Sequence, residues 1–348
     1  CRRNTMAAEK DRSLLKWFSV LLLMLMMAIA GSLFLGHRWY ENQLDLEMTD
    51  AVGEFITVRQ GASIRQVAEL LEEEGIIRSA FLFRLHMRIE HPEASVKAGE
   101  YLFERPATTR RAAAKLVEGD VYHHRITVPE GLDWQETAEL LGRQGFGSKE
   151  EFAKLISDPG LISSLDPEAD NLEGYLFPET YFVTRETTPA EIVSLMVSRF
   201  RTHWSEEWDR RAKDLGMSVR DIVTLASLIE KETALAEERP LVSSVFHNRL
   251  AEDMKLACDP TVIYAVKRVK PWDGIIHQSD LELDSPYNTY LYPGLPPGPI
   301  ASPGLASIRA ALYPAETMLL FFVSRNDGSH VFSDSYSQHA AAVKKYQR

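Results

Sequence analysis

The hydrophobic positions of the chain are spread unevenly, and the longest apolar run lies near the N-terminus. Residues 17–36, WFSVLLLMLMMAIAGSLFLG, carry no charge. A helix of this length rises about 1.5 Å per residue and spans roughly 30 Å, which is the thickness of the hydrocarbon core of a bilayer. The pattern predicts a transmembrane helix at 17–36. Basic residues in 1–16 place that segment in the cytoplasm by the positive-inside rule, with the remaining chain outside.

A cleaved signal peptide is the alternative to a retained anchor. Ala28-Ile29-Ala30 fits the small-x-small cleavage pattern. The apolar run continues to Leu35, however, and Trp39-Tyr40 stands where an interfacial aromatic belt is expected. These features favour a single-pass anchor in a bacterial plasma membrane. Met6 is an alternative start residue.

An internal repeat follows the apolar run. Residues 55–61, FITVRQG, are echoed by 125–131, RITVPEG, and the helical pattern of 67–71 is echoed by 137–141 at the same offset. Each copy predicts a short strand, a glycine turn and an amphipathic helix. Ser63 and Asp133 stand at the expected N-cap positions.

The repeat region, placed at 50–165, has two interpretations. It forms either a pair of packing units that act as a spacer, or a pair of small modules that bind glycan or cell wall. The two copies carry no aromatic platform at matched positions. Since a fold alone does not give a function, this favours the spacer slightly.

The second half of the chain, 166–348, alternates helical patterns with turn-rich segments. Helices are predicted at 189–215, 219–235 and 237–252. The proline- and glycine-rich stretch 285–300 carries several tyrosines, so an ordered loop is expected. A β-hairpin is predicted from residues 319–324 and 330–333. The expected fold class is mixed α+β.

Charge and cysteine content narrow the function classes. The chain has 50 acidic and 39 basic residues and a net charge of −11, which disfavours nucleic acid as a partner and leaves a neutral polymer possible. Cys1 and Cys258 are the two cysteines, and the anchor separates them, so no disulfide scaffold is expected. The histidines lack a metal-ligand spacing, and neither a metal site nor a cofactor is expected.

The strongest candidate for chemistry is Glu230. It follows Ile222 and Ala226 at helical spacing and therefore joins an apolar stripe. Burial should raise the pKa of this carboxyl group, and a protonated acid is what cleavage of a glycosidic bond requires. Ser227 and Thr233 flank it as candidate hydrogen-bond partners.

A structural role for Glu230 is the alternative, as the partner of a buried cation such as Arg249. Glu232, Glu237 and Glu238 are interpreted as solvated helix charges.

Several long motifs occur together in a fixed order. They are 172–180 (LEGYLFPET), 225–233 (LASLIEKET), 245–250 (VFHNRL), 259–264 (DPTVIY), 286–290 (PYNTY) and 294–301 (GLPPGPIA). In these motifs the chain resembles the MltG/YceG-like endolytic murein transglycosylases. The resemblance implies a membrane-anchored enzyme that cuts nascent peptidoglycan glycan, a LysM-like membrane-proximal region, and peptidoglycan synthases as neighbours. It maps the catalytic glutamate onto Glu230.

The resemblance also implies a mechanism without water, in which one acid cleaves the MurNAc–GlcNAc bond and leaves a 1,6-anhydro end. A hydrolytic muramidase normally needs a second carboxylate, for which Glu173, Glu179 and Asp259 are candidates. A non-catalytic wall-binding scaffold is the non-enzymatic alternative.

Substrate contacts are expected from side chains that suit a neutral sugar. Tyr287, Asn288, Thr289 and the loop 294–300 are assigned to the groove wall, and Asn248 with Arg249 either positions substrate or anchors the helix. The chain departs from the family pattern at three positions, which leaves their roles open: Ser302, Gln338 and Ala340.

Overall fold

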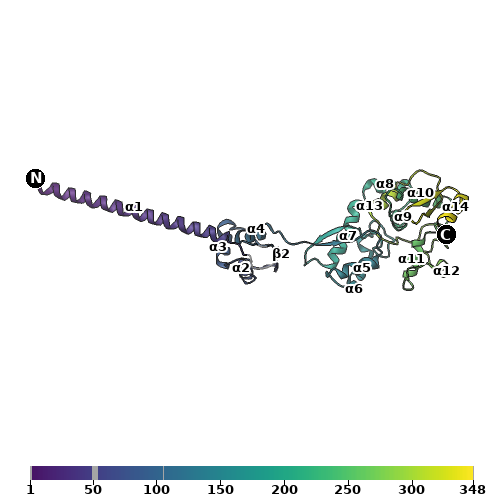
Figure 1. Ribbon diagram of the computed structural model, residues 1–348, viewed down its shortest axis with the longest axis horizontal. Helices are drawn as coiled ribbons and strands as arrows, with labels where there is room; N and C mark the ends of the chain where they lie inside the picture. The colour runs from purple at the N-terminus through teal and green to yellow at the C-terminus, as the bar shows by residue number, and fades with distance from the viewer. Residues whose placement is uncertain (1, 49–53, 105, 348) are drawn as a thin grey trace. The chain divides into compact units, whose positions relative to one another are not determined.

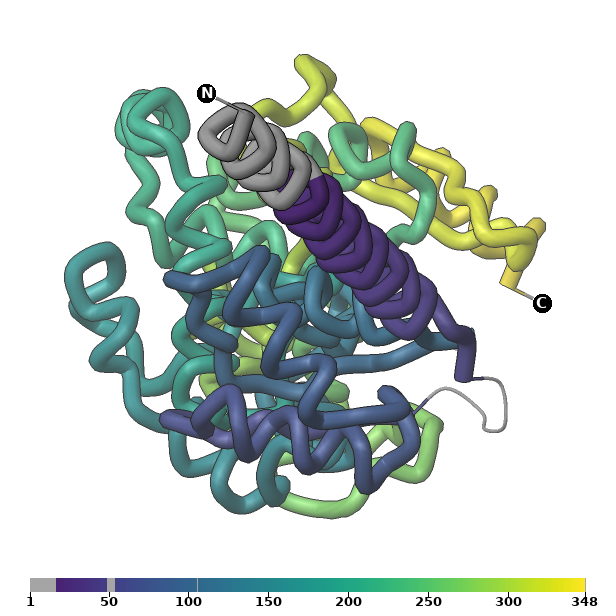
Figure 2. Tube along the Cα trace, turned by 90° about the vertical axis from the view of Figure 1, so that its left-hand side faces the viewer, coloured from purple at the N-terminus to yellow at the C-terminus, as the bar shows by residue number. Residues whose placement is uncertain are grey.

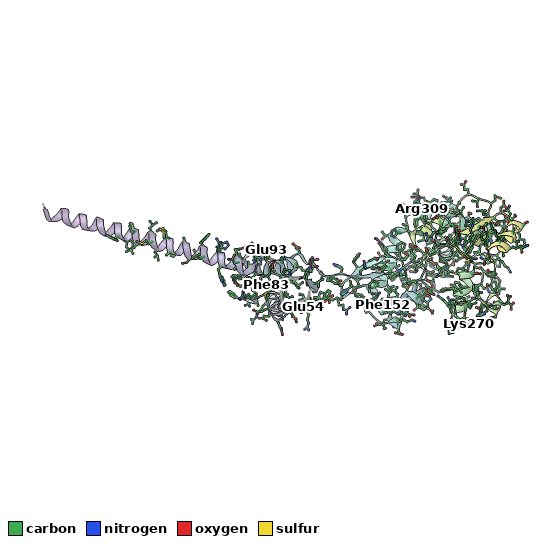
Figure 3. The ribbon with its side chains drawn as sticks, in the orientation of Figure 1. Glu54, Phe83, Glu93, Phe152, Lys270 and Arg309 are labelled. Carbon is green, nitrogen blue, oxygen red and sulfur yellow. The ribbon has the colours of Figure 1, made fainter. Side chains whose placement is uncertain are left out.

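The computed structural model describes residues 2–48, 54–104 and 106–347, with side chains from residue 17 onward. The predictions made on Cys1 and on the basic flank therefore fall outside the described side chains. The chain has the expected mixed α+β composition and divides into two compact units, Cys1–His123 and His124–Arg348 (Figures 1 and 3).

The first unit begins with one long helix, α1 (Arg2–Leu44). Its segment Trp17–Leu44 is apolar enough and long enough to cross a membrane, with a mean hydropathy of 2.5. The C-terminal end of α1 packs into the same unit, because Leu44 is fully buried and Arg110 pairs with Asp45 at 2.9 Å. The apolar segment is thus joined without interruption to the small folded module that follows it.

That module contains the first copy of the repeat. Strand β1 (Glu54–Val58) pairs antiparallel with β2 (Gly99–Phe103), and the helices pack beside them. The predicted N-cap is confirmed, since Ser63 forms a capping box with Gln66 at the start of α2. The module's helices are α2 (Ile64–Glu73), α3 (Ala80–Glu90) and α4 (Thr109–Glu118).

The second copy of the repeat belongs to the second unit. Strand β3 (His124–Thr127) pairs antiparallel with β4 (Thr180–Val183), and α5 (Trp134–Arg143) begins with a capping box at Asp133. This pairing places the structural division at residue 123, not at the expected 165, because β4 comes from the segment after the repeat. Helix α6 (Lys149–Ile156) and the 3₁₀ turn Pro159–Leu161 follow α5.

The predicted helix 189–215 is two helices. Trp204 has an extended backbone conformation, and the side chain of Ser205 caps a new helix by accepting a hydrogen bond from the N–H of Trp208. The remaining elements are α7 (Pro189–His203), α8 (Glu206–Asp214), α9 (Val219–Glu232), α10 (Arg239–Ala251), α11 (Asp259–Lys267), α12 (Gln278–Leu281) and α13 (Leu305–Leu312).

Helix α9 forms the centre of the second unit. Its residues Ile222 to Ile229 are all buried, and it packs against α10 and α13 (Figure 1). Ser218 and Asp221 form a capping box at its N-terminus, which fixes where the helix starts. The C-terminal turn of α9, with Glu230 and Glu232, is thereby held by a rigid element.

The chain ends in the predicted hairpin and one further helix. Strands β5 (Phe321–Ser324) and β6 (His330–Ser333) pair antiparallel, and α14 (Tyr336–Tyr346) packs against both, as the yellow segment of Figure 2 shows. The loop between α12 and α13, described throughout, contains no helix or strand and is held by hydrogen bonds within the loop and to Ser227 of α9.

Candidate functional site

Glu230 lies in a charged cluster at the end of α9. Its Oε1 is 3.4 Å from a guanidinium nitrogen of Arg239, and its Oε2 accepts a hydrogen bond of 2.9 Å from the backbone N–H of Gly304. The Glu230 side chain is only 7% exposed. Glu230 therefore forms an ion pair with a largely buried arginine, as the alternative prediction expected, but the partner is Arg239 and not Arg249.

A second carboxylate, Glu130, shares this cluster. Its Oε2 is 3.9 Å from Arg239. Burial raises the pKa of Glu130, and the negative charge of Glu230 adds to the rise, whereas the positive charge of Arg239 opposes it. A Cβ atom at Gly304 would lie 1.8 Å from a Glu130 oxygen, so the Glu130 side chain would have to move to admit one. The sequence motifs gave no signal for Glu130, Arg239 or Gly304.

The flanking residues Ser227 and Thr233 make other contacts than the expected ones. The Ser227 hydroxyl donates to the carbonyl of Thr224 and accepts from the N–H of Ile300 at 3.1 Å. Thr233 Oγ1 donates to Glu238 at 3.3 Å. Both side chains hold loops in place, and the structure does not bring either one into hydrogen-bond contact with Glu230.

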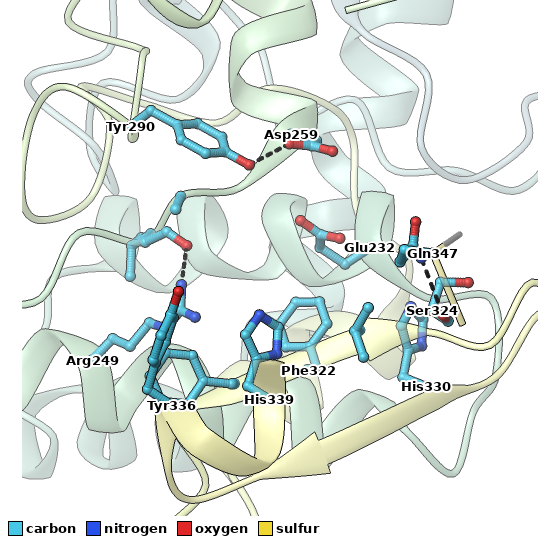
Figure 4. Close-up of a pocket in the computed structure, with 14 residues that line it drawn as sticks. Glu232, Arg249, Asp259, Tyr290, Phe322, Ser324, His330, Tyr336, His339 and Gln347 are labelled. Atoms are coloured by element: carbon cyan, nitrogen blue, oxygen red, sulfur yellow. Dashed lines mark hydrogen bonds between the residues drawn. The ribbon is translucent and has the colours of Figure 1, made fainter. Parts of the chain in front are cut away.

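Glu232 faces a cavity of about 460 Å³ that Glu230 does not line. The cavity is built by α9, α10, the start of α11, the 285–290 turn, the β5–β6 hairpin and α14. Figure 4 shows Tyr290 and Asp259 on one side of it and the aromatic residues of the hairpin and α14 on the other. Its lining includes Glu232, Asp259, Tyr290, Phe321, Tyr336 and His339.

Glu232 has the protonation behaviour that was expected of Glu230. Burial raises the pKa of Glu232 to about 7, and the nearby Asp259 adds to the rise, whereas a hydrogen bond from the Cys258 thiol opposes it. Glu232 was interpreted as a solvated charge, and this is wrong because the hairpin and α14 cover it. A carboxyl group with a pKa near 7 in an open cavity can act as an acid and then as a base.

Aromatic rings form one wall of this cavity. The ring of His339 stacks on that of Phe321 at 5.1 Å, and Tyr336 lies edge-on to Phe321 at 6.1 Å. Tyr336 is 72% exposed, so a ligand can reach its face. On the other side the Tyr290 hydroxyl donates to Asp259 at 2.5 Å (Figure 4). Rings combined with a few fixed polar groups are typical of a small-molecule or sugar pocket.

Glu238 is also not a solvated charge, whereas Glu237 is exposed as expected. Glu238 accepts hydrogen bonds from the backbone N–H of His330 at 2.9 Å and contacts its Nδ1 at 2.6 Å. Although burial acts to raise the pKa of Glu238, these bonds to His330 lower it. The pair fixes β6 to the N-terminus of α10 and orients His330 at the cavity.

Asn248 and Arg249 anchor α10 to the segment just before β5. The Asn248 amide donates to the carbonyls of Thr317 and Leu319, both at 2.9 Å. The Arg249 guanidinium donates to the carbonyls of Leu320 and Leu256, both at 2.7 Å. Arg249 also lines the cavity, so it supports the hairpin wall beside Glu232.

Within the 286–290 motif, the two buried residues support the turn. The Asn288 amide donates to the carbonyls of Leu281 and Leu283, and the Thr289 hydroxyl accepts from the N–H of Cys258. Tyr287 and Tyr290 flank them and are partly exposed. Asn288 and Thr289, predicted to contact substrate, instead fix the backbone of the turn, and Tyr287 and Tyr290 are its accessible side chains.

The three candidate second carboxylates occupy different environments. Asp259 lines the Glu232 cavity. Glu179 pairs with Arg199 on the surface. Glu173 is buried, and burial raises its pKa to about 8, although hydrogen bonds from the Trp134 N–H and the Tyr264 hydroxyl oppose the rise.

The three residues that depart from the family pattern lie in two different parts of the second unit. Ser302 is buried, and its backbone exchanges hydrogen bonds with Gly131 and Leu132 next to the Glu230 cluster. Gln338 and Ala340 are exposed on α14. His339, which stands between them, lines the cavity.

Comparisons with known proteins agree with the motifs. A model of the YceG-like family matches residues 56–345. An endolytic murein transglycosylase of Bacillus subtilis is 33% identical over 84% of each chain. A protein of the same name from Streptococcus pneumoniae is 25% identical over 95% of this chain and 65% of its own length. A crystal structure of a YceG-like protein from Listeria monocytogenes is 31% identical, covers 83% of this chain and 98% of its own, and has a TM-score of 0.58. The chain belongs to the YceG-like family.

Proposed function

We propose that this protein is a membrane-anchored endolytic lytic transglycosylase of peptidoglycan. It cleaves MurNAc-β-1,4-GlcNAc bonds in nascent glycan strands and leaves 1,6-anhydro-MurNAc ends. The observation that carries the proposal is a carboxyl group with a pKa of about 7, Glu232, at the wall of a 460 Å³ cavity lined by aromatic rings. The names of the Bacillus and Streptococcus relatives give the substrate class.

The mechanism needs one carboxyl group that changes role. Protonated Glu232 gives its proton to the glycosidic oxygen as the C1–O bond of MurNAc breaks. The Glu232 carboxylate then takes the proton of the C6 hydroxyl, and the C6 oxygen closes on C1. A pKa near neutral suits both steps, because the group is readily protonated and deprotonated at the working pH.

Glu230 remains the rival acid, as the family motif predicted. Against it stand the ion pair with Arg239 of α10 and the hydrogen bond from the N–H of Gly304 at the start of α13, which favour a structural role for this carboxylate. Glu130 beside it is a second carboxylate of the same cluster. We therefore assign the chemistry to Glu232 and the fixing of α9 against α10 and α13 to Glu230.

Two matched substitutions separate the roles. Glu232→Gln is expected to lower kcat on uncross-linked glycan by about 10²–10⁴, the usual contribution of a general acid, with an unchanged melting temperature. Glu230→Gln is expected to lower the melting temperature, because Arg239 loses its buried partner, and to retain measurable turnover at low temperature. Glu237→Gln, which changes an exposed carboxylate, is the control. An active Glu232→Gln with an inactive, stable Glu230→Gln would return the assignment to Glu230.

Product mass separates the transglycosylase from a hydrolytic muramidase. Anhydro ends are lighter than reducing MurNAc ends by one water molecule, because the proposed route adds none. Asp259, which lies in the cavity, is the second carboxylate that a hydrolase would use. A non-catalytic wall-binding scaffold predicts bound glycan of unchanged length.

We also propose a membrane topology and a role for each region of the chain. Helix Trp17–Leu44 anchors the chain in the plasma membrane, with residues 1–16 in the cytoplasm and the folded units outside. The region 50–165 acts as a LysM-like spacer or glycan-binding region, and 166–348 carries the catalytic site. Peptidoglycan synthases are the expected neighbours.

A further inference from the structure

A second pocket, of about 210 Å³, opens at the C-terminal end of α11. It lies in the second unit and is lined by residues of α5, α11 and the turn before Glu173. Its lining includes Trp134, Gln135, Asn171, Tyr264, Lys267 and Arg268. The reaction proposed above uses none of them.

The chemistry of this pocket suits a sugar ring. The Arg268 guanidinium lies over the rings of Tyr264 and Tyr287, at 5.7 and 5.2 Å from their centroids. Within the described part of the chain no carboxylate pairs with Arg268, so its donors are free for a ligand. Trp134 is half-buried and Gln135 is exposed. Aromatic faces and a few planar polar groups are the combination that orients a polar ring.

The pocket is preformed. Glu173, beneath it, accepts hydrogen bonds from the N–H of Trp134 at 3.2 Å and from the hydroxyl of Tyr264 at 3.1 Å. Lys267 Nζ is held by Asp133 at 3.0 Å and Glu136 at 2.6 Å. Fixing these walls in advance reduces the ordering cost of binding.

One helix connects this pocket to the Glu232 cavity. Asp259 lines the cavity and Lys267 lines the second pocket, and Ile263 stands halfway between them at spacings of four residues. Residues at this spacing share one helix face, and the eight-residue separation corresponds to about 12 Å along the axis. A short run of sugar units can cover such a span.

The 286–290 turn follows the same path. Tyr290 donates to Asp259 at the cavity end, and the Tyr287 ring contacts that of Tyr264 at 4.9 Å at the pocket end. The buried residues Asn288 and Thr289 fix the turn between the two tyrosines. The turn and α11 thus lie side by side from the one pocket to the other.

We propose that the second pocket is a distal subsite, which binds another sugar unit of the glycan strand whose scissile bond lies in the Glu232 cavity. The distance between the two pockets then sets how many sugar units separate the cut bond from the sugar bound in the second pocket. This inference rests on the proposed transglycosylase function and adds a strand-length preference to it.

The test compares long glycan strands with a tetrasaccharide, using the full chain. The double variant Gln135→Ala with Arg268→Ala removes two exposed side chains, and Trp134→Ala removes the aromatic face. Arg309→Ala, which removes an exposed arginine on α13 (Figure 3), is the matched control. Melting temperatures confirm that each variant is folded.

The ratio of kcat/KM for long strands to that for the tetrasaccharide is expected to fall about tenfold in the double variant, the factor given by one lost hydrogen bond from a charged donor. The fall should appear in KM, and the lengths of the products should become less uniform. An unchanged ratio, or an equal loss on both substrates, overturns the proposal.

Binding separates this inference from the proposed chemistry. The affinity for intact glycan strands is measured for the full chain carrying Glu232→Gln, and for the same chain that also carries the pocket substitutions. Weaker binding on losing the pocket side chains supports the subsite even if the chain cleaves no glycan. Equal binding overturns it, whether or not the transglycosylase proposal holds.

Discussion

Glu230 and Glu232 are two residues apart at the end of α9, and a helix turns by about 200° between them. The two carboxylates therefore face opposite sides. Glu230 meets Arg239 and the backbone N–H of Gly304, whereas Glu232 meets the thiol of Cys258 and an open cavity. Sequence spacing pointed to the C-terminal turn of α9, but the environments of its two glutamates are set by segments distant in the sequence.

Cys258 tunes the proposed acid. Since its thiol hydrogen bond lowers the pKa of Glu232, Cys258→Ala is expected to raise that pKa and to move the alkaline limb of the activity–pH profile from near pH 7 to higher pH. Activity falls as pH rises through this limb because the acid loses its proton. Profiles of kcat/KM on purified glycan measure the shift. Cys258→Ser, which keeps a donor, is the control, and identical profiles for all three proteins would contradict the assignment.

Glu173 makes stability depend on pH. Burial raises its pKa to about 8 in the folded chain, above its ordinary value of 4.5. Between these values the folded state holds the proton more tightly than the unfolded state, so stability falls as pH rises. Glu173→Gln is expected to remove most of the loss in melting temperature between pH 5 and pH 9. Thermal unfolding against Glu237→Gln tests this, and a wild-type melting temperature that rises over this range would contradict it.

At the scale of elements, local patterns were the most reliable guide. The capping boxes at Ser63 and Asp133 and the final hairpin were readable because each depends on residues close together in the sequence. The break at Trp204–Ser205 was missed because a cap inside a continuous apolar pattern changes the periodicity very little. The pairing of β3 with β4 was missed because register between distant strands has no local signal.

The cavity around Glu232 was missed for the same reason. Its walls come from α9, α11, β5 and α14, which are more than 100 residues apart at the extremes. Tyr336 and His339 belong to a segment that departs from the family pattern, so the motifs did not emphasise it. Only the fold brings these aromatic rings opposite the end of α9.

Helix α14 contributes little buried side-chain surface to the hydrophobic core, so its removal is expected to leave the core intact. It contains no buried residue, yet it supplies Tyr336 and His339 to the cavity, and Gln347 directly after it also lines the cavity. Deletion of 335–348 is expected to raise KM on glycan several-fold while the cooperative unfolding of the rest persists. Steady-state kinetics and calorimetry measure the two effects. A full loss of the unfolding transition would show that α14 is part of the folding unit, and an unchanged KM would remove it from the site.

At the scale of the whole molecule, the apolar helix is continuous with the first folded unit. It continues to Leu44, which is fully buried in the first unit, and Arg110 there pairs with Glu41 and Asp45. The apolar segment and the first module therefore share one continuous helix. In the proposed single-pass arrangement, this helix would limit how freely that module moves at the membrane surface.

Two truncations test this coupling. A chain starting at His37 loses the apolar run but keeps Leu44, and is expected to be released from membranes with the melting of its first unit unchanged. A chain starting at Thr49 also loses Leu44 and the partners of Arg110, and its first unit is expected to melt several degrees lower, because removal of a buried leucine side chain costs about 2–5 kcal/mol. Fractionation and calorimetry measure both effects. Equal melting of the two chains would contradict the coupling, whereas membrane retention of the chain starting at His37 would move the anchor elsewhere.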